Sequence, residues 1–153
     1  HVVIYFEAVD LPELWDFFTA LPTSVVVDHM GRPDVNKPID GPEFGLFLKF
    51  MHEHANVWSK VSCPERLSAL GPPALNGERA AYRDVVPFAR RVVETFPDRV
   101  LWGTDWPHPN LKGHMPDDGL LVDFIPHIAV TSELQRKLLV DNPMRLYWPE
   151  ETA

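Results

Sequence analysis

The chain has 153 residues, 45% of them hydrophobic, which suits one domain with a buried core and excludes a disordered chain. Its formal net charge of -8 argues against a nucleic-acid-binding surface, because such surfaces need clustered lysines and arginines. No apolar run approaches the roughly 20 residues of a membrane span, so we expect a cytoplasmic protein with neither a nucleic-acid partner nor a membrane partner.

The hydrophobic pattern predicts short strands that alternate with amphipathic helices along the chain. The strands are expected over residues 2–6, 24–28, 57–62 and 100–104. The helices are expected over residues 11–21, 42–54, 82–96, 119–129 and 132–140. Pro87 lies early in the third of these helices and predicts either a kink or a later start of that helix. The single cysteine, Cys63, is expected to be a buried packing residue without a chemical role.

Strands that alternate with helices predict an α/β fold with a parallel sheet built from (β/α) repeats. Four such repeats are half of an eight-repeat TIM barrel, which takes about 250 residues. We therefore expect residues 1–153 to form a single partial domain, half of a TIM barrel, with a small doubly wound sheet as the alternative. A half barrel leaves two sheet edges exposed, so we also expect a homo-oligomer formed through these edges.

Polar residues follow each predicted strand. In parallel α/β folds the carboxyl ends of the strands lie at one edge of the sheet, where ligands bind, so we expect these residues to share one rim. They are Tyr5 and Glu7, then Asp28 and His29, then Ser62, Glu65 and Arg66, and finally Asp105, His108 and Asn110.

The segment after the last strand carries the strongest functional signal. A β-rich run ends at Gly103, which permits close approach of the backbone, and two prolines stiffen the loop that follows Asp105. An acid, a histidine and an amide therefore stand at a strand end, where α/β proteins place their chemistry. The alternatives are that Asp105 caps a turn and that His108 packs on Trp106.

The other candidates have ordinary structural alternatives. For His29 the alternative is an imidazole hydrogen-bonded at a strand end. A guanidinium binds a carboxylate through two parallel hydrogen bonds, which suits Arg66, but an ion pair with Glu65 or plain solvent exposure is the alternative. Arg32 is a competing candidate for the carboxylate-binding role of Arg66. For Tyr5 the alternative is burial in the core, because a tyrosine in an apolar strand is more often a core residue than a ligand-binding one.

Three segments resemble the amidohydrolase-related TIM-barrel enzymes. They are residues 25–33 (VVVDHMGRP), 102–109 (WGTDWPHP) and 141–147 (DNPMRLY). The resemblance covers essentially the full chain, and the Gly-Thr-Asp-Trp-Pro-His-Pro block is specific to a subgroup, the 2-pyrone-4,6-dicarboxylate lactonases. It implies the C-terminal half of a TIM barrel and a hydrolase that opens a cyclic ester during bacterial degradation of lignin aromatics.

The resemblance also implies roles for particular residues. Asp105 would be the general base that activates water, with its basicity raised by partial burial, and His29 would help to polarise the lactone carbonyl. The residues that would contact a small dicarboxylate substrate are Tyr5, Arg66, Asn110 and His108. Of these, the tyrosine and the arginine would hold the substrate carboxylates.

The chain departs from the family pattern in one respect. The paired His-x-His of the family's first strand and its N-terminal arginines have no counterpart here. Related amidohydrolases bind a divalent metal through such residues, whereas the lactonase branch works without one, so we expect no metal and no cofactor. Two alternatives remain: a metal-dependent hydrolase or decarboxylase of the same superfamily, and a non-catalytic half barrel.

Overall fold

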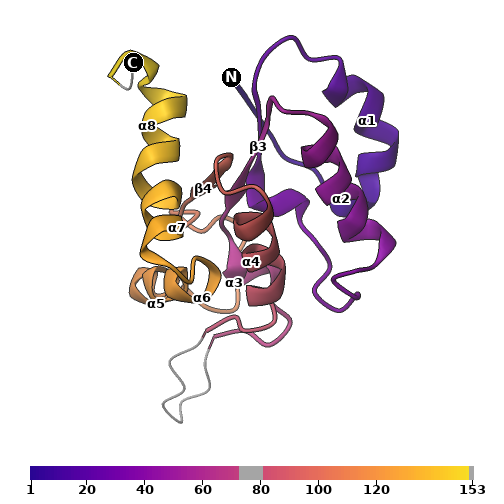
Figure 1. Cartoon of the computed structure of the whole chain (residues 1–153). Helices are drawn as coiled ribbons and strands as arrows, with labels where there is room; N and C mark the ends of the chain where they lie inside the picture. Colours follow the sequence, from indigo (N-terminus) through magenta and orange to yellow (C-terminus); the bar gives the residue numbers. More distant parts are fainter. Residues whose placement is uncertain (73–80, 152–153) are drawn as a thin grey trace.

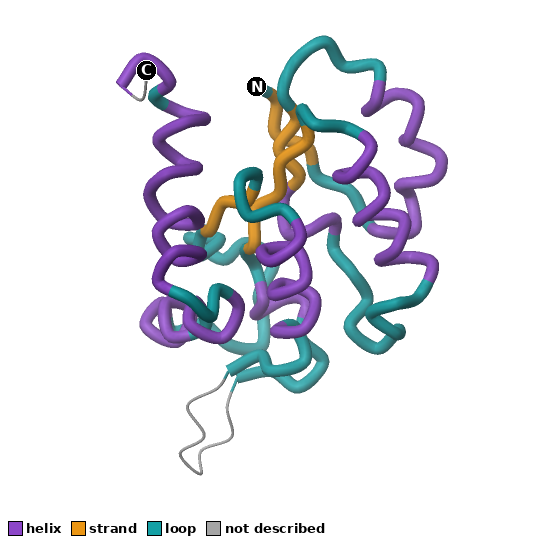
Figure 2. The backbone as a smooth tube through the Cα atoms, in the orientation of Figure 1, coloured by secondary structure: helices purple, strands orange, loops and turns teal. Residues whose placement is uncertain are grey.

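The computed structural model describes residues 1–72 and 81–151. Four parallel strands form one sheet in the order β1-β2-β3-β4, and Figure 2 shows them twisted together among the helices. They are β1 (Val2–Ile4), β2 (Val25–Val27), β3 (Val57–Val61) and β4 (Val100–Trp102). The expected α/β fold is confirmed. Within the described part of the chain the strand order never reverses, as it would in a doubly wound sheet, so that alternative is wrong.

Helices connect the strands, as parallel pairing requires. Figure 1 shows α1 and α2 at one side of the view and α8 at the other, with β3 and β4 between them. The longer helices are α1 (Leu11–Thr19), α2 (Pro42–Glu53) and α4 (Val86–Thr95). The shorter ones are α3 (Pro64–Leu67), α5 (Asp118–Asp123), α6 (Ile125–Ile128), α7 (Ser132–Arg136) and α8 (Asn142–Tyr147), with η1 (Ala8–Asp10), η2 (Asp28–Gly31), η3 (Lys137–Asp141) and η4 (Pro149–Glu151).

The two faces of the sheet are packed unequally. Val25 and Val27 of β2 belong to the main core, together with phenylalanines of α2 such as Phe50. Val26, which points to the opposite face, packs with Trp58 and Leu101 in a separate small cluster. Successive side chains of a strand alternate between faces, so β2, β3 and β4 each contribute to both clusters.

The helices differ from the predicted ones in their bounds. The expected helix over residues 82–96 begins at Val86, because Pro87 lacks an amide hydrogen and fits the first turn. The expected helix over residues 119–129 is divided into α5 and α6, with Pro126 in the first turn of the second. The expected helix over residues 132–140 continues through a π-helical segment, η3, into α8. The one-turn helix α3 was not predicted.

A buried amide joins the last helix to the sheet. Asn142, which is 1% exposed, donates from Nδ2 to the carbonyl oxygens of Pro97 (2.9 Å) and Val100 (2.8 Å). These bonds fix the start of α8 against β4. Across residues 1–72 and 81–151, no helix has the length and apolar character needed to cross a membrane.

Candidate active site

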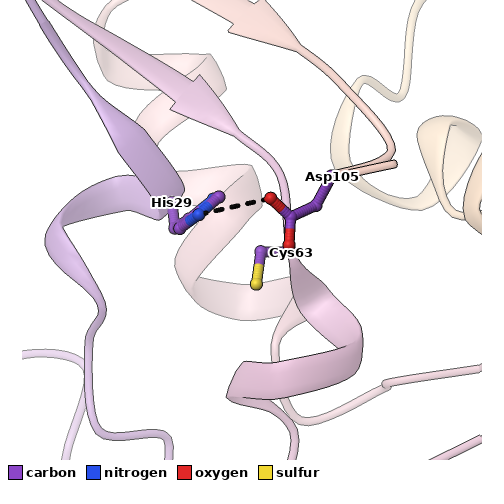
Figure 3. A group of neighbouring side chains, drawn as sticks. All are labelled: His29, Cys63 and Asp105. Atoms are coloured by element: carbon purple, nitrogen blue, oxygen red, sulfur yellow. Dashed lines mark ion pairs between the residues drawn. The ribbon is translucent and has the colours of Figure 1, made fainter. Parts of the chain in front are cut away.

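The ends of three neighbouring strands bring His29, Cys63 and Asp105 together (Figure 3). His29 Nε2 lies 3.5 Å from Asp105 Oδ1, and these side chains are only 8% and 14% exposed. One ligand atom from each of the three residues lies within 4.8 Å of the others. The structure therefore places the two predicted catalytic residues in contact and adds a cysteine to which the sequence analysis gave no role.

All three residues have a left-handed backbone conformation. The φ angles are 54° at His29, 63° at Cys63 and 66° at Asp105. Each residue stands two or three positions beyond the last residue of its strand. A non-glycine residue in a sparsely populated conformation costs about 1–3 kcal/mol and persists where the surrounding structure holds it, which is common at active sites. The chain thus turns sharply at the end of each strand, and this turn aims the side chain at the shared rim.

The guanidinium of Arg66 lies in the middle of this group. Its Nη2 donates to Asp105 Oδ2 at 2.8 Å and lies 3.0 Å from His29 Nε2. Its Nε donates to Cys63 Sγ at 2.8 Å. The side chain of Arg66 is 12% exposed and pairs with Asp105 rather than with Glu65 or solvent. The alternatives of a Glu65 ion pair and of solvent exposure are therefore both wrong.

The contacts of His29 indicate which ring nitrogen carries the proton. A guanidinium only donates hydrogen bonds, so His29 Nε2 accepts from Arg66, and Nδ1–H donates to Ser62 Oγ at 2.8 Å. Burial lowers the pKa of His29, against the opposing effect of the Asp105 charge, and the Arg66 charge lowers this pKa further. The imidazole is therefore neutral at neutral pH and hydrogen-bonded on both sides.

Cys63 is fully buried and protonated. Burial raises the pKa of its thiol to about 12. A thiol rather than a thiolate therefore faces Arg66, and a thiol is a poor nucleophile. The expectation that Cys63 is buried is confirmed, and its contact with Arg66 is what the sequence analysis missed.

Tyr5 lies beside the group rather than in the core. The residue is 52% exposed, and its ring meets the His29 ring edge-on at 6.0 Å between centroids, so the core alternative is wrong. The Tyr5 hydroxyl donates to Glu7 Oε1 at 2.7 Å, and Arg32 Nε donates to Glu7 Oε2 at 2.8 Å. This hydrogen bond to Glu7 is the largest cause that raises the pKa of Tyr5. Tyr5 and Arg32 are thus held together by one exposed carboxylate next to His29.

A pocket of about 370 Å³ opens over the same strand ends. Small-molecule sites usually fall between about 300 and 1,000 Å³, so this volume suits a compact ligand. Its lining includes Asp28, His29, Lys60, Ser62, Asp105 and Trp106. Lys60 Nζ lies 2.9 Å from Asp28 Oδ1, and the indole of Trp106 is 75% exposed. The pocket therefore presents charged groups and one free aromatic face.

The structure does not bring His108 or Asn110 into this group. His108 is 4% exposed, and its two ring nitrogens contact Glu65 Oε1 at 3.3 Å and Asp118 Oδ1 at 3.1 Å. Asn110 is exposed farther along the same loop, with φ at 70°. The imidazole of His108 faces two carboxylates instead of the pocket, and it does not pack on the exposed Trp106.

A divalent metal fits this donor set poorly. His29, Cys63 and Asp105 offer one ligand atom each, but the Arg66 guanidinium is hydrogen-bonded to all three side chains. A cation placed among these donors would lie against a permanent positive charge, and Cys63 would have to lose a proton from a thiol with a pKa near 12. The arginine thus supplies the positive charge of this site.

Comparison with known proteins relates this chain to lactone-hydrolysing enzymes. The model of the amidohydrolase family matches residues 1–148. A 2-pyrone-4,6-dicarboxylate hydrolase of Comamonas testosteroni is 87% identical over 151 residues, which are 99% of this chain and 50% of that protein. A 4-sulfomuconolactone hydrolase of Hydrogenophaga intermedia is 35% identical over 148 residues, which are 95% of this chain and 46% of that protein.

A solved structure also matches this chain over about half of its own length. A putative 2-pyrone-4,6-dicarboxylic acid hydrolase from Pseudomonas putida matches with a TM-score of 0.74 and 26% sequence identity. The match covers 96% of this chain and 51% of that chain. The chain therefore spans about half the length of the relatives that it matches.

Proposed function

Because this chain belongs to the amidohydrolase family, we propose that it carries the catalytic residues for hydrolysis of a carboxylate-bearing lactone of the 2-pyrone-4,6-dicarboxylate type. The relative at 87% identity is named as a hydrolase of 2-pyrone-4,6-dicarboxylate, and the relative at 35% identity is named as a hydrolase of 4-sulfomuconolactone. The observation that carries the proposal is the contact of Asp105 with both Arg66 and His29 beside a polar pocket. It offers a base, a carboxylate-binding group and an imidazole in one place.

The proposed reaction begins with an exchange of ion pairs. In the structure Arg66 neutralises the carboxylate of Asp105, with 2.8 Å between Nη2 and Oδ2. A substrate carboxylate competes for the same guanidinium, and a partner that offers two oxygens binds this fork best. Once Arg66 turns to the substrate, Asp105 is free to accept a proton. The substrate itself thereby activates the base.

The proposed chemical steps follow from that exchange. Asp105 takes a proton from water as the water oxygen attacks the lactone carbonyl carbon, which gives a tetrahedral oxyanion. The ring carbon–oxygen bond then breaks, and Asp105 returns the proton to the leaving oxygen. The product is a single open-chain molecule that carries both the new carboxyl group and the hydroxyl group released from the ring. The new carboxyl group gives its proton to solvent, and the enzyme regains its starting protonation state.

His29 is proposed to stabilise the oxyanion. When Arg66 leaves Nε2, the Ser62 hydroxyl can donate to Nδ1 instead of accepting from it, since a hydroxyl does both. The imidazole loses its Nδ1 proton to solvent and takes up a proton from solvent at Nε2, so the ring stays neutral. The Nε2–H then faces the reacting carbonyl oxygen, where a donor lowers the barrier. Tyr5 and Arg32, which both donate to Glu7 beside His29, are proposed to hold a second substrate carboxylate, and exposed Asn110 stays a proposed substrate contact.

The test is loss of pyrone ultraviolet absorbance in the presence of the purified 153-residue chain and, in parallel, of the protein as it is naturally expressed. Turnover that Asp105→Asn abolishes supports the proposal. Turnover that requires an added divalent metal, identified by elemental analysis, favours a metal-dependent hydrolase or decarboxylase. Absence of turnover by both proteins favours a non-catalytic half barrel or another substrate.

Three further expectations remain proposals. Residues 1–153 are proposed to act as one partial domain, whose edge strands β1 and β4 pair with a second copy. Val2 and Val3 of β1 are 39% and 47% exposed, which suits such pairing. A cytoplasmic location, in keeping with a small anionic substrate of aromatic degradation, is also proposed. Sedimentation and cell fractionation test these points.

A further inference from the structure

A second contact joins the same two segments that the Arg66–Asp105 ion pair joins. Glu65 immediately precedes Arg66 at the start of α3, and His108 lies in the loop that carries Asp105. Glu65 Oε1 lies 3.3 Å from His108 Nδ1. Glu65 is thus adjacent in sequence to Arg66, and His108 follows Asp105 by three positions. Only a very short length of backbone therefore separates the Glu65–His108 pair from Arg66 and Asp105.

The Glu65–His108 pair is much more deeply buried than the Arg66–Asp105 ion pair. The side chains of Glu65 and His108 are 0% and 2% exposed, against 12% and 14% for Arg66 and Asp105. Glu65 Oε2 has no hydrogen-bond partner within residues 1–72 and 81–151, and His108 is the side chain that contacts the other carboxyl oxygen. A buried polar pair of this kind is costly to break, because its members cannot turn to water.

The loop that this pair holds is conformationally strained. Asp105 and His108 both have left-handed backbones, with φ at 66° and 59°, and the His108 amide donates to the Asp105 carbonyl oxygen at 2.7 Å. Non-glycine residues stay in such conformations only where other contacts fix them. His108 supplies two such contacts, because its Nε2 also lies 3.1 Å from Asp118 Oδ1 at the start of α5. The imidazole therefore ties the loop to α3 on one side and to α5 on the other.

We propose that Glu65 and His108 are positioning residues, whose buried pair holds the loop after β4 in the conformation that presents Asp105 to Arg66 and His29. His108 does not contact substrate in this arrangement, since both ring nitrogens are engaged away from the pocket. The proposal assigns a role to a buried carboxyl that the hydrolytic steps leave unused. It rests on the proposed function only for its kinetic readout.

The experiment compares three variants of His108 in the protein as it is naturally expressed. His108→Asn places an amide near the Nδ1 position and keeps a partner for Glu65, His108→Gln keeps one near Nε2 for Asp118, and His108→Leu keeps neither. We expect His108→Leu to lower kcat by about 10- to 100-fold with a much smaller change in KM, as a small displacement of a catalytic group does. His108→Asn should recover most of that loss, and His108→Gln should recover less.

A double-mutant cycle tests whether the two residues act as a pair. Glu65→Gln should lower kcat by itself, and the Glu65→Gln, His108→Leu double variant should be little worse than His108→Leu alone, because each change removes the same contact. His52→Leu, at an exposed position of α2, is the control and should keep the wild-type kcat. Strictly additive losses, or equal activity of His108→Leu and wild type, would overturn the proposal.

Amide hydrogen exchange provides a readout that needs no substrate. In His108→Leu the backbone amide at position 108 should exchange at least about 10-fold faster than in wild type, while the amides of α2 keep their protection. If wild type fails to hydrolyse any lactone, the proposed function fails, and the exchange result alone decides the positioning role. If His108→Leu does not fold, Glu65→Gln and His108→Asn are compared in the same way, and unchanged exchange in Glu65→Gln overturns the proposal.

Discussion

Replacing Asp105 by asparagine removes the proposed base while keeping its shape. The amide oxygen of asparagine still accepts a hydrogen bond from Arg66 Nη2, which lies 2.8 Å from Asp105 Oδ2, but an amide takes no proton from water at neutral pH. Loss of a general base costs about 10²- to 10⁴-fold in rate, which corresponds to about 2.7–5.4 kcal/mol of transition-state stabilisation. We therefore expect kcat of Asp105→Asn to fall by that factor.

The Michaelis constant should change little in the same variant. Arg66 stays in place, and one negative charge beside an anionic substrate is removed, so binding is not weakened. The assay is steady-state loss of pyrone absorbance at saturating and subsaturating substrate, with thermal unfolding as a check on the fold. Asp123→Asn, at an exposed position of α5, is the matched control and should retain wild-type kinetics. A kcat for Asp105→Asn within about threefold of wild type would remove Asp105 from the mechanism.

Three further predictions concern binding and stability. Arg66→Met should raise KM for a dicarboxylate by about 10-fold or more, because charge-assisted hydrogen bonds contribute about 1.5–3 kcal/mol each. The rise in KM should be smaller for an analogue that has a single carboxylate. An unchanged KM would contradict the binding role of Arg66. Burial lowers the pKa of His29 in the folded protein. Between this lowered pKa and the unfolded value of about 6.5, the unfolded state binds more protons than the folded state. The free energy of unfolding therefore falls as pH falls through this range, by up to about 1.4 kcal/mol per pH unit. Melting temperatures from about pH 7.5 to 5 should therefore drop more steeply for wild type than for His29→Gln, and equal slopes would refute this. Asn142→Ala leaves the carbonyl oxygens of Pro97 and Val100 without their donor and should lower the unfolding free energy by about 2–4 kcal/mol in urea denaturation, whereas a loss below about 0.5 kcal/mol would show that water replaces the amide.

The strand ends explain why so much of the site could be predicted from the sequence. Parallel pairing places the carboxyl ends of β2, β3 and β4 side by side, so polar residues after each strand had to meet. This brought together His29, Arg66 and Asp105, which lie far apart in sequence. The half-barrel expectation is confirmed as well, since the solved amidohydrolase relative is matched over 51% of its length.

The conformations of individual residues could not be predicted in the same way. Nothing in a pattern of apolar residues indicates that His29, Cys63 and Asp105 adopt left-handed backbones, because these depend on contacts made elsewhere in the fold. The burial of His108 was also missed, since a histidine between two prolines is typical of an exposed loop. The sequence does hold a signal for this burial, namely two acidic residues that can pair with a histidine. Glu65 lies at the start of α3, which was not predicted, and Asp118 lies at the start of α5.

The difference in burial between the two contacts suggests a division of roles. The Arg66–Asp105 pair is partly exposed beside the pocket, and in the proposed mechanism a substrate carboxylate reaches the guanidinium and replaces Asp105 there. The Glu65–His108 pair is shielded from water by burial, and in the same proposal it stays closed while the first pair opens. If both pairs were exposed, substrate binding would release the whole loop, and the Asp105 carboxylate would no longer be held beside His29. If both were buried, Asp105 would remain neutralised by Arg66, and catalysis would have no free base.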